Sequence, residues 1–401
     1  MISNLEQIYS VSIASMKRSI IRELLKLTQK PEIISFAGGL PSPESFPVND
    51  LQGIVCEMLQ AEGTQALQYG ATEGDAKLRK LLVEKYRKDG MNIKLDNLII
   101  TTASQQGLDL LGKIFINRGD KVIVGLPSYL GALSAIGSYG AEFVGIPLDN
   151  DGMRSDLLAE KLAELKKAGT MPKFIYIIPD FQNPAGITMP LYRRKEILAL
   201  AHQYNLLIVE DCPYREIRFE GEHVPTLYEL DGTEQVIVLG TFSKTFAPGF
   251  RIGWVIANEA IVDKFVVAKQ AADLCTPPFV QKIAARYMEK NLFDKNIQKT
   301  IAMYKEKRNV MLESFRQHMP KGVTWTEPQG GLFLFITLPE HMDAEKLFPK
   351  AIEKNVAYVL GSAFYCDGGG KNTMRLNFSF SSVADIREGV KRLAEVIREA
   401  M

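Results

Sequence analysis

The chain has 401 residues, more than the roughly 250 to 300 at which one hydrophobic core stops growing, so we expect two domains. Its 48 basic and 47 acidic residues nearly cancel, which gives no electrostatic case for a nucleic-acid or anionic-membrane partner. The four cysteines form no C-x-x-C pair and the four histidines show no metal-ligand spacing, so we expect no metal site. Residues 1–9 do not resemble a secretory signal, and no apolar run reaches the ~18 residues of a membrane span. With so few cysteines, we therefore expect a cytoplasmic protein.

In chain order, a helical stretch from Met16 to Thr28 comes first, and we expect it to gate a site or join the smaller domain. From about Asn97, short apolar runs alternate with helical stretches, which predicts an α/β fold around a buried, mostly parallel sheet. The seven expected strands are Leu98–Thr101, Lys121–Val124, Glu142–Ile146, Phe174–Ile178, Leu206–Glu210, Val236–Leu239 and Ile252–Ile256. The helices expected between them include Gln105–Phe115, Arg154–Ala168 and Leu191–Tyr204.

The pattern changes after about Met303 and predicts a smaller α+β domain. Its expected elements are a charged helix Tyr304–His318, a strand-pair region Gly331–Thr337, a helix Ala344–Lys354 and a strand Met374–Phe380. We therefore assign residues 46–300 to a large domain, and residues 1–45 and 301–401 to a small one.

The segment Gly240–Trp254 carries the strongest chemical signal. It follows an expected strand, so its lysine, arginine and hydroxyls gather at a strand's carboxyl end, where ligands of open α/β sheets bind. The glycine spacing of a Walker loop is absent. This pattern favours Lys244 as a covalent amine, beside a phosphate held by Thr241, Ser243 and Arg251. The alternative is a solvated loop lysine among ordinary turn hydroxyls.

Three more segments place polar residues where an expected strand ends. Thr101–Asp109 opens a helix, with Ser104 as the expected N-cap, and such a helix start attracts phosphate. Ile178–Gly186 ends in a turn whose Asn183 could enter a site, although Asn-Pro is also a common turn pair. Ile208–Tyr214 brings two carboxylates to the end of a buried strand, where each needs a cation or a donor.

Together these four segments resemble the class I aminotransferases of fold type I, which depend on pyridoxal phosphate (PLP). The resemblance covers nearly the whole chain and is closest to the branch of bacterial α-aminoadipate and mammalian kynurenine/aminoadipate aminotransferases. The segments that match this branch are Ile21–Lys26, Ser35–Pro41, Leu67–Gly70, Ser104–Gln106 and Pro127–Tyr129.

The resemblance implies a role for each matching residue. Lys244 would hold the cofactor as a Schiff base and carry the substrate's proton, and Asp211 would pair with the protonated pyridine nitrogen. Asn183 and Tyr214 would bind the phenolic oxygen, and Tyr129 would stack on the ring. The phosphate would be bound by Ser104, Gln105, Thr241, Ser243 and Arg251, with Tyr69 reaching it from a second subunit. The last role implies a homodimer with shared active sites.

Substrate contacts follow from the same resemblance. Arg375 would bind the α-carboxylate together with Asn183, and Gly39 beside Gly38 would let the backbone approach the substrate. Arg22 would contact the side-chain carboxylate of acidic amino acids. For Arg22 and Arg375 the alternative is an arginine on a solvated face.

The sequence thus predicts a cytoplasmic aminotransferase that moves the amino group of an L-amino acid to 2-oxoglutarate or a related 2-oxo acid. The expected donors are 2-aminoadipate and glutamate, with aromatic and aliphatic amino acids also compatible. Two alternatives remain open at this point. One is another PLP reaction on the same fold, such as β-elimination, decarboxylation or cyclisation. The other is a non-enzymatic, aminotransferase-like protein that binds an effector.

Overall fold

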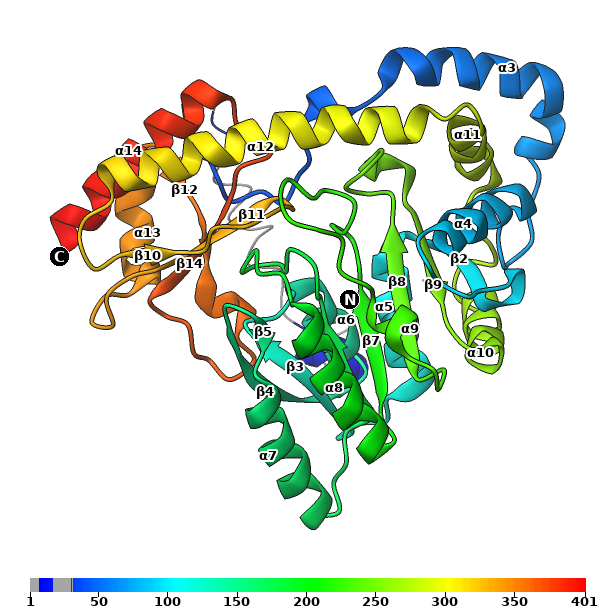
Figure 1. The fold of residues 1–401 in the computed structure, drawn as a ribbon, viewed down its shortest axis with the longest axis horizontal. Coiled ribbons are helices and arrows are strands. Elements are labelled where there is room, and N and C mark those ends of the chain that lie inside the picture. Colours follow the sequence, from blue (N-terminus) through cyan, green and yellow to red (C-terminus); the bar gives the residue numbers. More distant parts are fainter. Residues whose placement is uncertain (1–6, 17–29, 31) are drawn as a thin grey trace.

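The main sheet of the protein has eight strands in the order β2-β9-β8-β7-β6-β3-β4-β5 (Figure 1). The computed structural model describes residues 7–16, 30 and 32–401. The strands of this sheet are β2 (Leu98–Thr102), β3 (Lys121–Leu126), β4 (Glu142–Asp149), β5 (Gly152–Met153), β6 (Phe174–Ile177), β7 (Leu207–Asp211), β8 (Val236–Thr241) and β9 (Ile252–Ile256). All seven expected strands are present. The two-residue strand β5, antiparallel to the end of β4, is an eighth that the sequence pattern does not predict.

Most strands of this sheet run in one direction, as the sequence predicts. Neighbours β4, β3, β6, β7 and β8 pair in parallel. Strand β9 is antiparallel to both β8 and β2, so β2 has the same direction as β8. The carboxyl ends of β2, β3, β6, β7 and β8 therefore meet at one edge, together with the start of β9. Every loop singled out by the sequence leaves or enters the sheet at this edge.

Helices cover both faces of the main sheet, because alternate residues of its buried strands are apolar on both sides. On one face, Tyr176 and Val209 belong to a core with α5 (Ala103–Phe115), α6 (Leu130–Gly137) and α10 (Glu259–Gln270). On the other face, Ile175 and Ile208 belong to a core that includes residues of α3 (Val48–Ala66), of the start of α12 (Leu292–His318) and of five further helical segments. These five segments are α4 (Ala76–Lys88), α7 (Ser155–Lys167), α8 (Leu191–Tyr204), α11 (Pro278–Glu289) and α9 (Leu227–Leu230).

A second, four-stranded sheet has the order β10-β11-β14-β13 and is antiparallel throughout. Its strands are β10 (Thr324–Trp325), β11 (Phe333–Thr337), β13 (Val359–Leu360) and β14 (Thr373–Asn377), and the helices beside it are α12 (Leu292–His318), α13 (Ala344–Glu353) and α14 (Val383–Ala400). Helix α12 begins at Leu292 rather than at Tyr304, because no proline or glycine interrupts the intervening residues. It extends from beside α14 to the neighbourhood of α11 (Figure 1).

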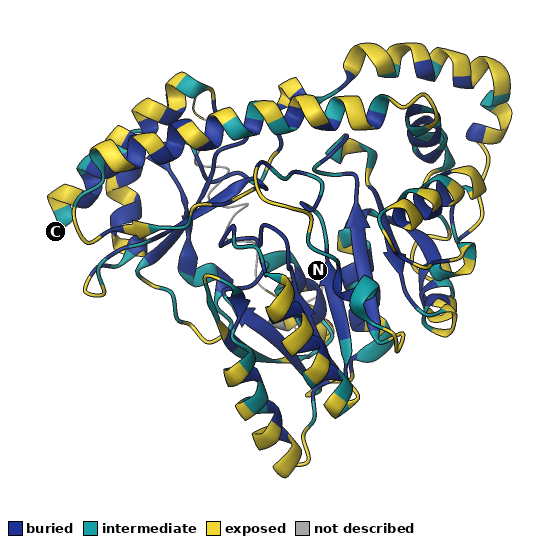
Figure 2. Cartoon of the chain, viewed as in Figure 1, coloured by how far each residue is buried: buried dark blue, intermediate teal, exposed yellow. Residues whose placement is uncertain are grey.

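The N-terminal part joins the two sheets. Strand β1 (Ile34–Ser35) pairs in parallel with β12 (Val356–Ala357), and the chain then passes into α3 (Val48–Ala66). Helix α3 is exposed along most of its length (Figure 2). Short helical segments complete the fold: α1 (Val11–Ser15), η2 (Pro43–Ser45), η3 (Leu95–Asn97), η4 (Pro248–Phe250) and η5 (Gly361–Phe364). The expected helix Met16–Thr28 lies almost entirely outside the described residues. In the part of the chain that the structure describes, no helix is long and apolar enough to cross a membrane.

Candidate active site

A cavity of about 440 Å³ opens at the carboxyl edge of the main sheet, between this sheet and β11 and β14 of the second sheet. Most residues that the sequence singles out meet here. The cavity is lined by Gly39, Leu40, Ala103, Ser104, Gln105, Tyr129, Ile178, Asn183, Asp211, Pro213, Tyr214, Thr241, Ser243, Lys244, Pro248, Arg251, Phe333 and Arg375. Five separate strand ends contribute to this set, which explains how residues from Ser104 to Arg251 share one space.

Lys244 follows β8, and its amine donates a hydrogen bond of 2.7 Å to the carbonyl oxygen of Gly39. Burial, together with the positive charges of Arg375 and Arg251, lowers the pKa of this amine to about 8. A lysine with such a pKa holds a much larger neutral fraction near neutral pH than an exposed lysine does. The side chain is therefore suited to act as a nucleophile or as a base.

Asp211 is the last residue of β7, and only 2% of it is exposed. One carboxylate oxygen, Oδ2, accepts a hydrogen bond of 2.7 Å from the hydroxyl of Tyr176. The other, Oδ1, is buried without a hydrogen-bond partner among the described residues. Burial raises the pKa of Asp211 to about 7, against the lowering effect of the Tyr176 hydrogen bond. Within the described part of the chain, no cation accompanies this buried carboxylate, as one normally would accompany a buried charge.

The preceding residue, Glu210, has hydrogen-bond donors for both oxygens of its carboxylate. Strand side chains alternate, so Glu210 projects from the opposite face of the sheet. Its carboxylate accepts hydrogen bonds from the backbone N–H groups of Leu227 (3.0 Å) and Tyr228 (3.2 Å) at the start of α9. Of the two adjacent carboxylates, only Asp211 faces the cavity.

Hydroxyl and guanidinium groups gather at another part of the cavity. The Thr241 hydroxyl donates to the carbonyl oxygen of Ile252 (3.0 Å) and accepts from the backbone N–H of Ser243 (3.1 Å), which fixes the turn after β8. Arg251 precedes β9 with a left-handed backbone (φ 53°) and lines the cavity. Ser104 and Gln105 lie beside it in the first turn of α5.

The start of α5 lies very close to β9, and a glycine permits this. A Cβ atom on Gly253 would lie 2.5 Å from the backbone nitrogen of Ser104, so only glycine fits without a shift. The prediction that Ser104 is the N-cap is wrong: α5 begins at Ala103 and its N-cap is Thr102. Ser104 is therefore inside the first turn, among the backbone N–H groups that a helix leaves unpaired.

Arg375 reaches the cavity from β14 of the second sheet, and only 2% of it is exposed. Its guanidinium donates to Asn183 Oδ1 (3.0 Å) and to the carbonyl oxygen of Ala37 (2.9 Å). It also lies over the rings of Phe333 (4.3 Å to the centroid) and Phe364 (5.2 Å). Burial lowers the pKa of Arg375 to about 10, so the group remains a cation at neutral pH.

Asn183, Tyr214 and Tyr129 complete the set around the cavity. The Asn183 amide donates a long hydrogen bond of 3.4 Å to the Tyr214 hydroxyl, and both residues are almost completely buried. Burial raises the pKa of Tyr214 and of the half-buried Tyr129, so both hydroxyls keep their protons. The residues from the loops after β3, β6 and β7 thus present neutral polar groups next to the charged Lys244 and Arg375.

Gly39 lines the cavity and makes a contact that the sequence does not predict. Its backbone does not adopt the left-handed conformation that requires glycine. An added Cβ would make ordinary contacts with Phe333 (3.6 Å) and Arg375 (4.0 Å). Its position in the site instead rests on its carbonyl oxygen, which accepts the hydrogen bond from Lys244.

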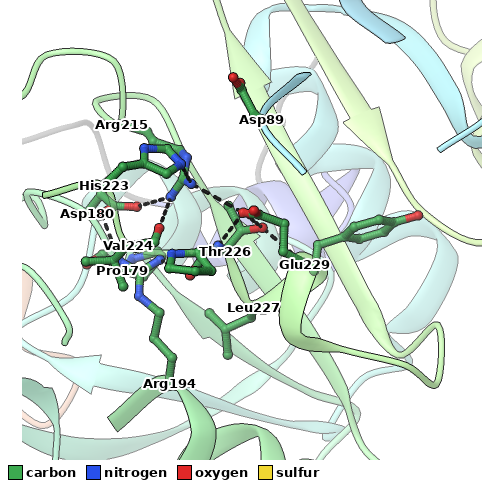
Figure 3. Close-up of polar contacts among 12 residues, drawn as sticks. Asp89, Pro179, Asp180, Arg194, Arg215, His223, Val224, Thr226, Leu227 and Glu229 are labelled. Carbon is green, nitrogen blue, oxygen red and sulfur yellow. Dashed lines mark hydrogen bonds and ion pairs between the residues drawn. The ribbon is translucent and has the colours of Figure 1, made fainter. Parts of the chain in front are cut away.

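A buried cluster of charges supports the loops that carry Asn183 and Tyr214 (Figure 3). At its centre, Asp180 has no exposed surface and accepts from Arg194 (2.8 Å), Arg215 (3.1 Å) and Arg218 (3.2 Å). Although burial opposes it, the three arginines hold the pKa of Asp180 below its usual range. The cluster therefore keeps a charged carboxylate inside the protein.

This cluster joins two loops of the site. Asp180 belongs to the loop after β6 that continues to Asn183, and Arg215 directly follows Tyr214 after β7. Arg215 also pairs with Glu229 at 3.3 Å, which connects the loops to α9 (Figure 3). The ion pair between Asp180 and Arg215 thus fixes the spacing of two cavity residues without touching the cavity.

Tyr69, which the sequence singles out, does not line this cavity. Tyr69 is 79% exposed and lies beyond the end of α3. Arg22 lies outside the described residues. The structure also brings in residues that the sequence reading missed, namely Phe333, Phe364 and Tyr176. Tyr176 had a sequence signal: it carries the only polar group in the strand Phe174–Ile177.

The chemistry of these residues fits pyridoxal phosphate. The unpartnered Oδ1 of Asp211 offers an anion to a protonated ring nitrogen, and Lys244 offers an amine to the aldehyde. Ser104, Gln105, Thr241, Ser243 and Arg251 supply phosphate donors around a helix start.

The chain matches the family described as aminotransferase class I and II over residues 44–393, and it belongs to this family. It is 50% identical to aromatic-amino-acid aminotransferase 1 of Thermococcus litoralis, over 99% of this chain and 95% of that protein. Pyrococcus horikoshii kynurenine aminotransferase, solved with PMP, is 46% identical with a TM-score of 0.96 over 100% and 99% of the two chains. Thermus thermophilus α-aminoadipate aminotransferase, complexed with N-(5'-phosphopyridoxyl)-L-leucine, is 38% identical with a TM-score of 0.91, covering 98% of each chain.

The protein is thus an aminotransferase with the fold of type I, as the resemblance in its sequence predicts. Family membership and these complexes imply pyridoxal phosphate as its cofactor. The alternative of a non-enzymatic binding protein is set aside, because relatives that are 50% and 40% identical to this chain are named as enzymes of the transferase class.

Proposed function

We propose that the protein transfers the amino group of an L-amino acid to 2-oxoglutarate or a related 2-oxo acid in two alternating half-reactions, with pyridoxal phosphate bound through Lys244. One observation carries this proposal: an amine with a lowered pKa, a buried carboxylate with a free oxygen and a buried arginine face the same cavity. These are Lys244, Asp211 and Arg375. Lys244 would react with the cofactor aldehyde, Asp211 would pair with the ring nitrogen, and Arg375 would bind the substrate carboxylate.

When bound, the cofactor supplies an aldehyde that links covalently to amines and a ring that accepts electrons released at the substrate's Cα. Lys244 would hold the cofactor and, once displaced by substrate, move the proton that leaves Cα. Asp211 would keep the ring nitrogen protonated by pairing with it. Asn183 and Tyr214 would bind the phenolic oxygen, and Tyr129 would lie on the ring.

The phosphate would be held by Ser104, Gln105, Thr241, Ser243 and Arg251. Arg375 would bind the substrate's α-carboxylate through its planar, two-pronged guanidinium, next to Asn183 and the Gly39 backbone. Its present partners, two oxygens and two aromatic rings, orient the group without neutralising its charge. The positive charge is therefore available to a carboxylate.

For the donor we propose 2-aminoadipate and glutamate, recognised by Arg22, with aromatic and aliphatic amino acids also accepted. The apolar side chains of Leu40, Ile178 and Pro213 in the cavity lining support acceptance of apolar substrates. The names of the relatives, which act on aromatic amino acids, kynurenine and aminoadipate, support a broad range.

We also propose a homodimer with shared active sites, in which Tyr69 reaches the partner's phosphate site. The high exposure of Tyr69 (79%) and of Leu67 beside it (74%) supports a surface that another chain covers. The separation of the eight-stranded sheet from the four-stranded sheet supports a division into residues 46–300 on one side, and 1–45 with 301–401 on the other. Four unpaired cysteines support a cytoplasmic location.

The test compares the fate of the amino group with that of the carbon skeleton. The purified, PLP-loaded protein is incubated with glutamate and with a 2-oxo acid other than 2-oxoglutarate. The proposal predicts one molecule of new amino acid for each molecule of 2-oxoglutarate formed. Absence of a new amino acid would contradict the proposal, and release of ammonia from an amino acid with a leaving group on Cβ, such as serine, would instead indicate elimination on the same fold.

A further inference from the structure

Tyr176 contacts the site from inside the main sheet and has no role in the function proposed above. In the pairing of β6 with β7, Tyr176 lies opposite Val209, and Asp211 is two residues further along β7. Because strand side chains alternate, Tyr176, Val209 and Asp211 project from the same face of the sheet. The tyrosine ring is long enough to cross this diagonal, and its hydroxyl reaches Asp211 Oδ2 at 2.7 Å.

The direction of this hydrogen bond is fixed by its surroundings. Tyr176 is 1% exposed, and burial holds its pKa well above the usual value of a tyrosine, so its hydroxyl keeps the proton and donates. Among the described residues, this hydroxyl is the one side-chain group that donates to the Asp211 carboxylate. Oδ2 is therefore occupied inside the sheet, while Oδ1 stays free.

We propose that Tyr176 is a positioning residue for the cofactor: its hydroxyl holds the Asp211 side chain in one orientation and stabilises its ionised form, so that Oδ1 presents a fixed negative charge to the ring nitrogen. This inference rests on the proposed function, because it needs a cationic ring nitrogen opposite Asp211. Tyr176 itself acts only through Asp211, since it does not line the cavity.

The test removes the hydroxyl alone, in Tyr176→Phe, and measures dissociation constants of the apoprotein for two probes. One probe is pyridoxal phosphate. The other is its 1-deaza analogue, in which a carbon replaces the ring nitrogen and carries no positive charge. Loss of a hydrogen bond to a charged group should weaken binding of pyridoxal phosphate roughly tenfold to a hundredfold. Binding of the deaza analogue should weaken much less, because Asp211 faces no cation there.

Tyr358→Phe is the matched control. Tyr358 is also fully buried, and its hydroxyl donates to the Ala344 carbonyl oxygen at 2.6 Å, away from Asp211. This variant should bind both probes as the wild type does. If Tyr176→Phe weakens both probes equally, or weakens neither, Tyr176 has no positioning role. In an Asp211→Asn background, where no carboxylate charge exists, Tyr176→Phe should add little further loss for pyridoxal phosphate.

Binding of pyridoxal phosphate by the wild type tests the proposed function, and the comparison with Tyr176→Phe tests the role of Tyr176. If the wild-type apoprotein does not bind pyridoxal phosphate at all, the proposed function is wrong. If the wild type binds it and Tyr176→Phe binds it equally well, the proposed function stands and the role of Tyr176 does not. Melting temperatures of the wild type, Tyr176→Phe and Tyr358→Phe show whether any loss of cofactor binding follows from unfolding.

Discussion

The amine of Lys244 and the carbonyl oxygen of Gly39 are 2.7 Å apart, although the two residues lie 205 positions apart in the chain. Arg375 makes a second link to the same segment, through the carbonyl oxygen of Ala37 at 2.9 Å. A third link runs from the Ser379 hydroxyl to the carbonyl oxygen of Leu40 at 2.8 Å. The segment 37–40 is thus held across one side of the cavity by residues from both sheets.

Asp211→Asn should change the stability of the apoprotein and of the loaded protein in opposite directions. The folded-state pKa of Asp211, about 7, lies above its unfolded value of about 3.9. The folded apoprotein therefore binds more protons between these two values, and its stability falls as the pH rises through this interval. Above pH 7 the wild-type apoprotein carries an uncompensated buried charge, which the asparagine variant lacks.

We therefore expect the Asp211→Asn apoprotein to be more stable than the wild type above pH 7, by roughly 1 to 3 kcal/mol, and to lose this advantage toward pH 4. With pyridoxal phosphate added, the order should reverse, because only the wild type pairs with a cationic ring nitrogen. Thermal unfolding at several pH values, with and without the cofactor, measures both effects. If the wild type and Asp211→Asn keep the same order of stability with and without the cofactor, Asp211 does not pair with the ring nitrogen.

Arg375→Lys should separate substrate binding from cofactor binding. The lysine keeps the charge but loses the planar fork that contacts Asn183 and lies over Phe333. We expect kcat/KM for amino acids to fall roughly tenfold to a hundredfold, with the affinity for pyridoxal phosphate nearly unchanged. Arg392→Lys, on α14 outside the cavity, is the control. Unchanged kcat/KM in Arg375→Lys would show that Arg375 does not bind the α-carboxylate of the substrate.

Arg22→Ala tests the specificity that the sequence predicts. We expect KM for glutamate and 2-aminoadipate to rise by an amount equivalent to roughly 1.5 to 3 kcal/mol, the value of one hydrogen bond to a charged group. Leucine has no side-chain carboxylate, so its KM serves as the internal control and should stay the same. Equal changes for leucine and glutamate would show that Arg22 does not select acidic substrates.

Mixing two inactive variants tests the shared active site. Tyr69→Ala should leave the fold intact, since the side chain is 79% exposed. If Tyr69 serves the partner's site, a dimer of one Tyr69→Ala chain and one Lys244→Ala chain contains one site with both residues. Refolding the two variants together should then restore part of the activity that each lacks alone. No recovery in a mixture shown to contain the hybrid would exclude a role across the interface.

The main sheet was predictable because its strands are short apolar runs between clear turns, and all seven appear at or within a few residues of their expected bounds. The polar residues after β6, β7 and β8 could be assigned to one site, because parallel strands bring their carboxyl ends to a common edge. The common direction of these strands is enough to place Asn183, Asp211 and Lys244 together. This placement does not need any knowledge of side-chain contacts.

The remaining features depend on register and tertiary contact. The hydrogen bond between Tyr176 and Asp211 requires one particular register between β6 and β7, which the hydrophobic periodicity of the sequence does not specify. The aromatic partners of Arg375 are Phe333 on β11 and Phe364 on η5, which lie on two other elements of the fold. The helix start at Ala103 rather than at Gln105, where the sequence predicts it, lies against β9, where Gly253 permits a close approach. Strand β5 has only two residues and leaves no pattern to detect.

The most direct test of the central claim is the visible absorption spectrum of the PLP-loaded protein, recorded for the wild type and for Lys244→Ala. We expect an absorption band of lysine-bound cofactor in the wild type, which disappears on addition of glutamate and returns with 2-oxoglutarate. Lys264→Ala, an exposed lysine variant, should behave as the wild type does. We also expect Lys244→Ala to lack both this band and the transfer activity. A Lys244→Ala protein that keeps the band and full turnover would contradict the central claim.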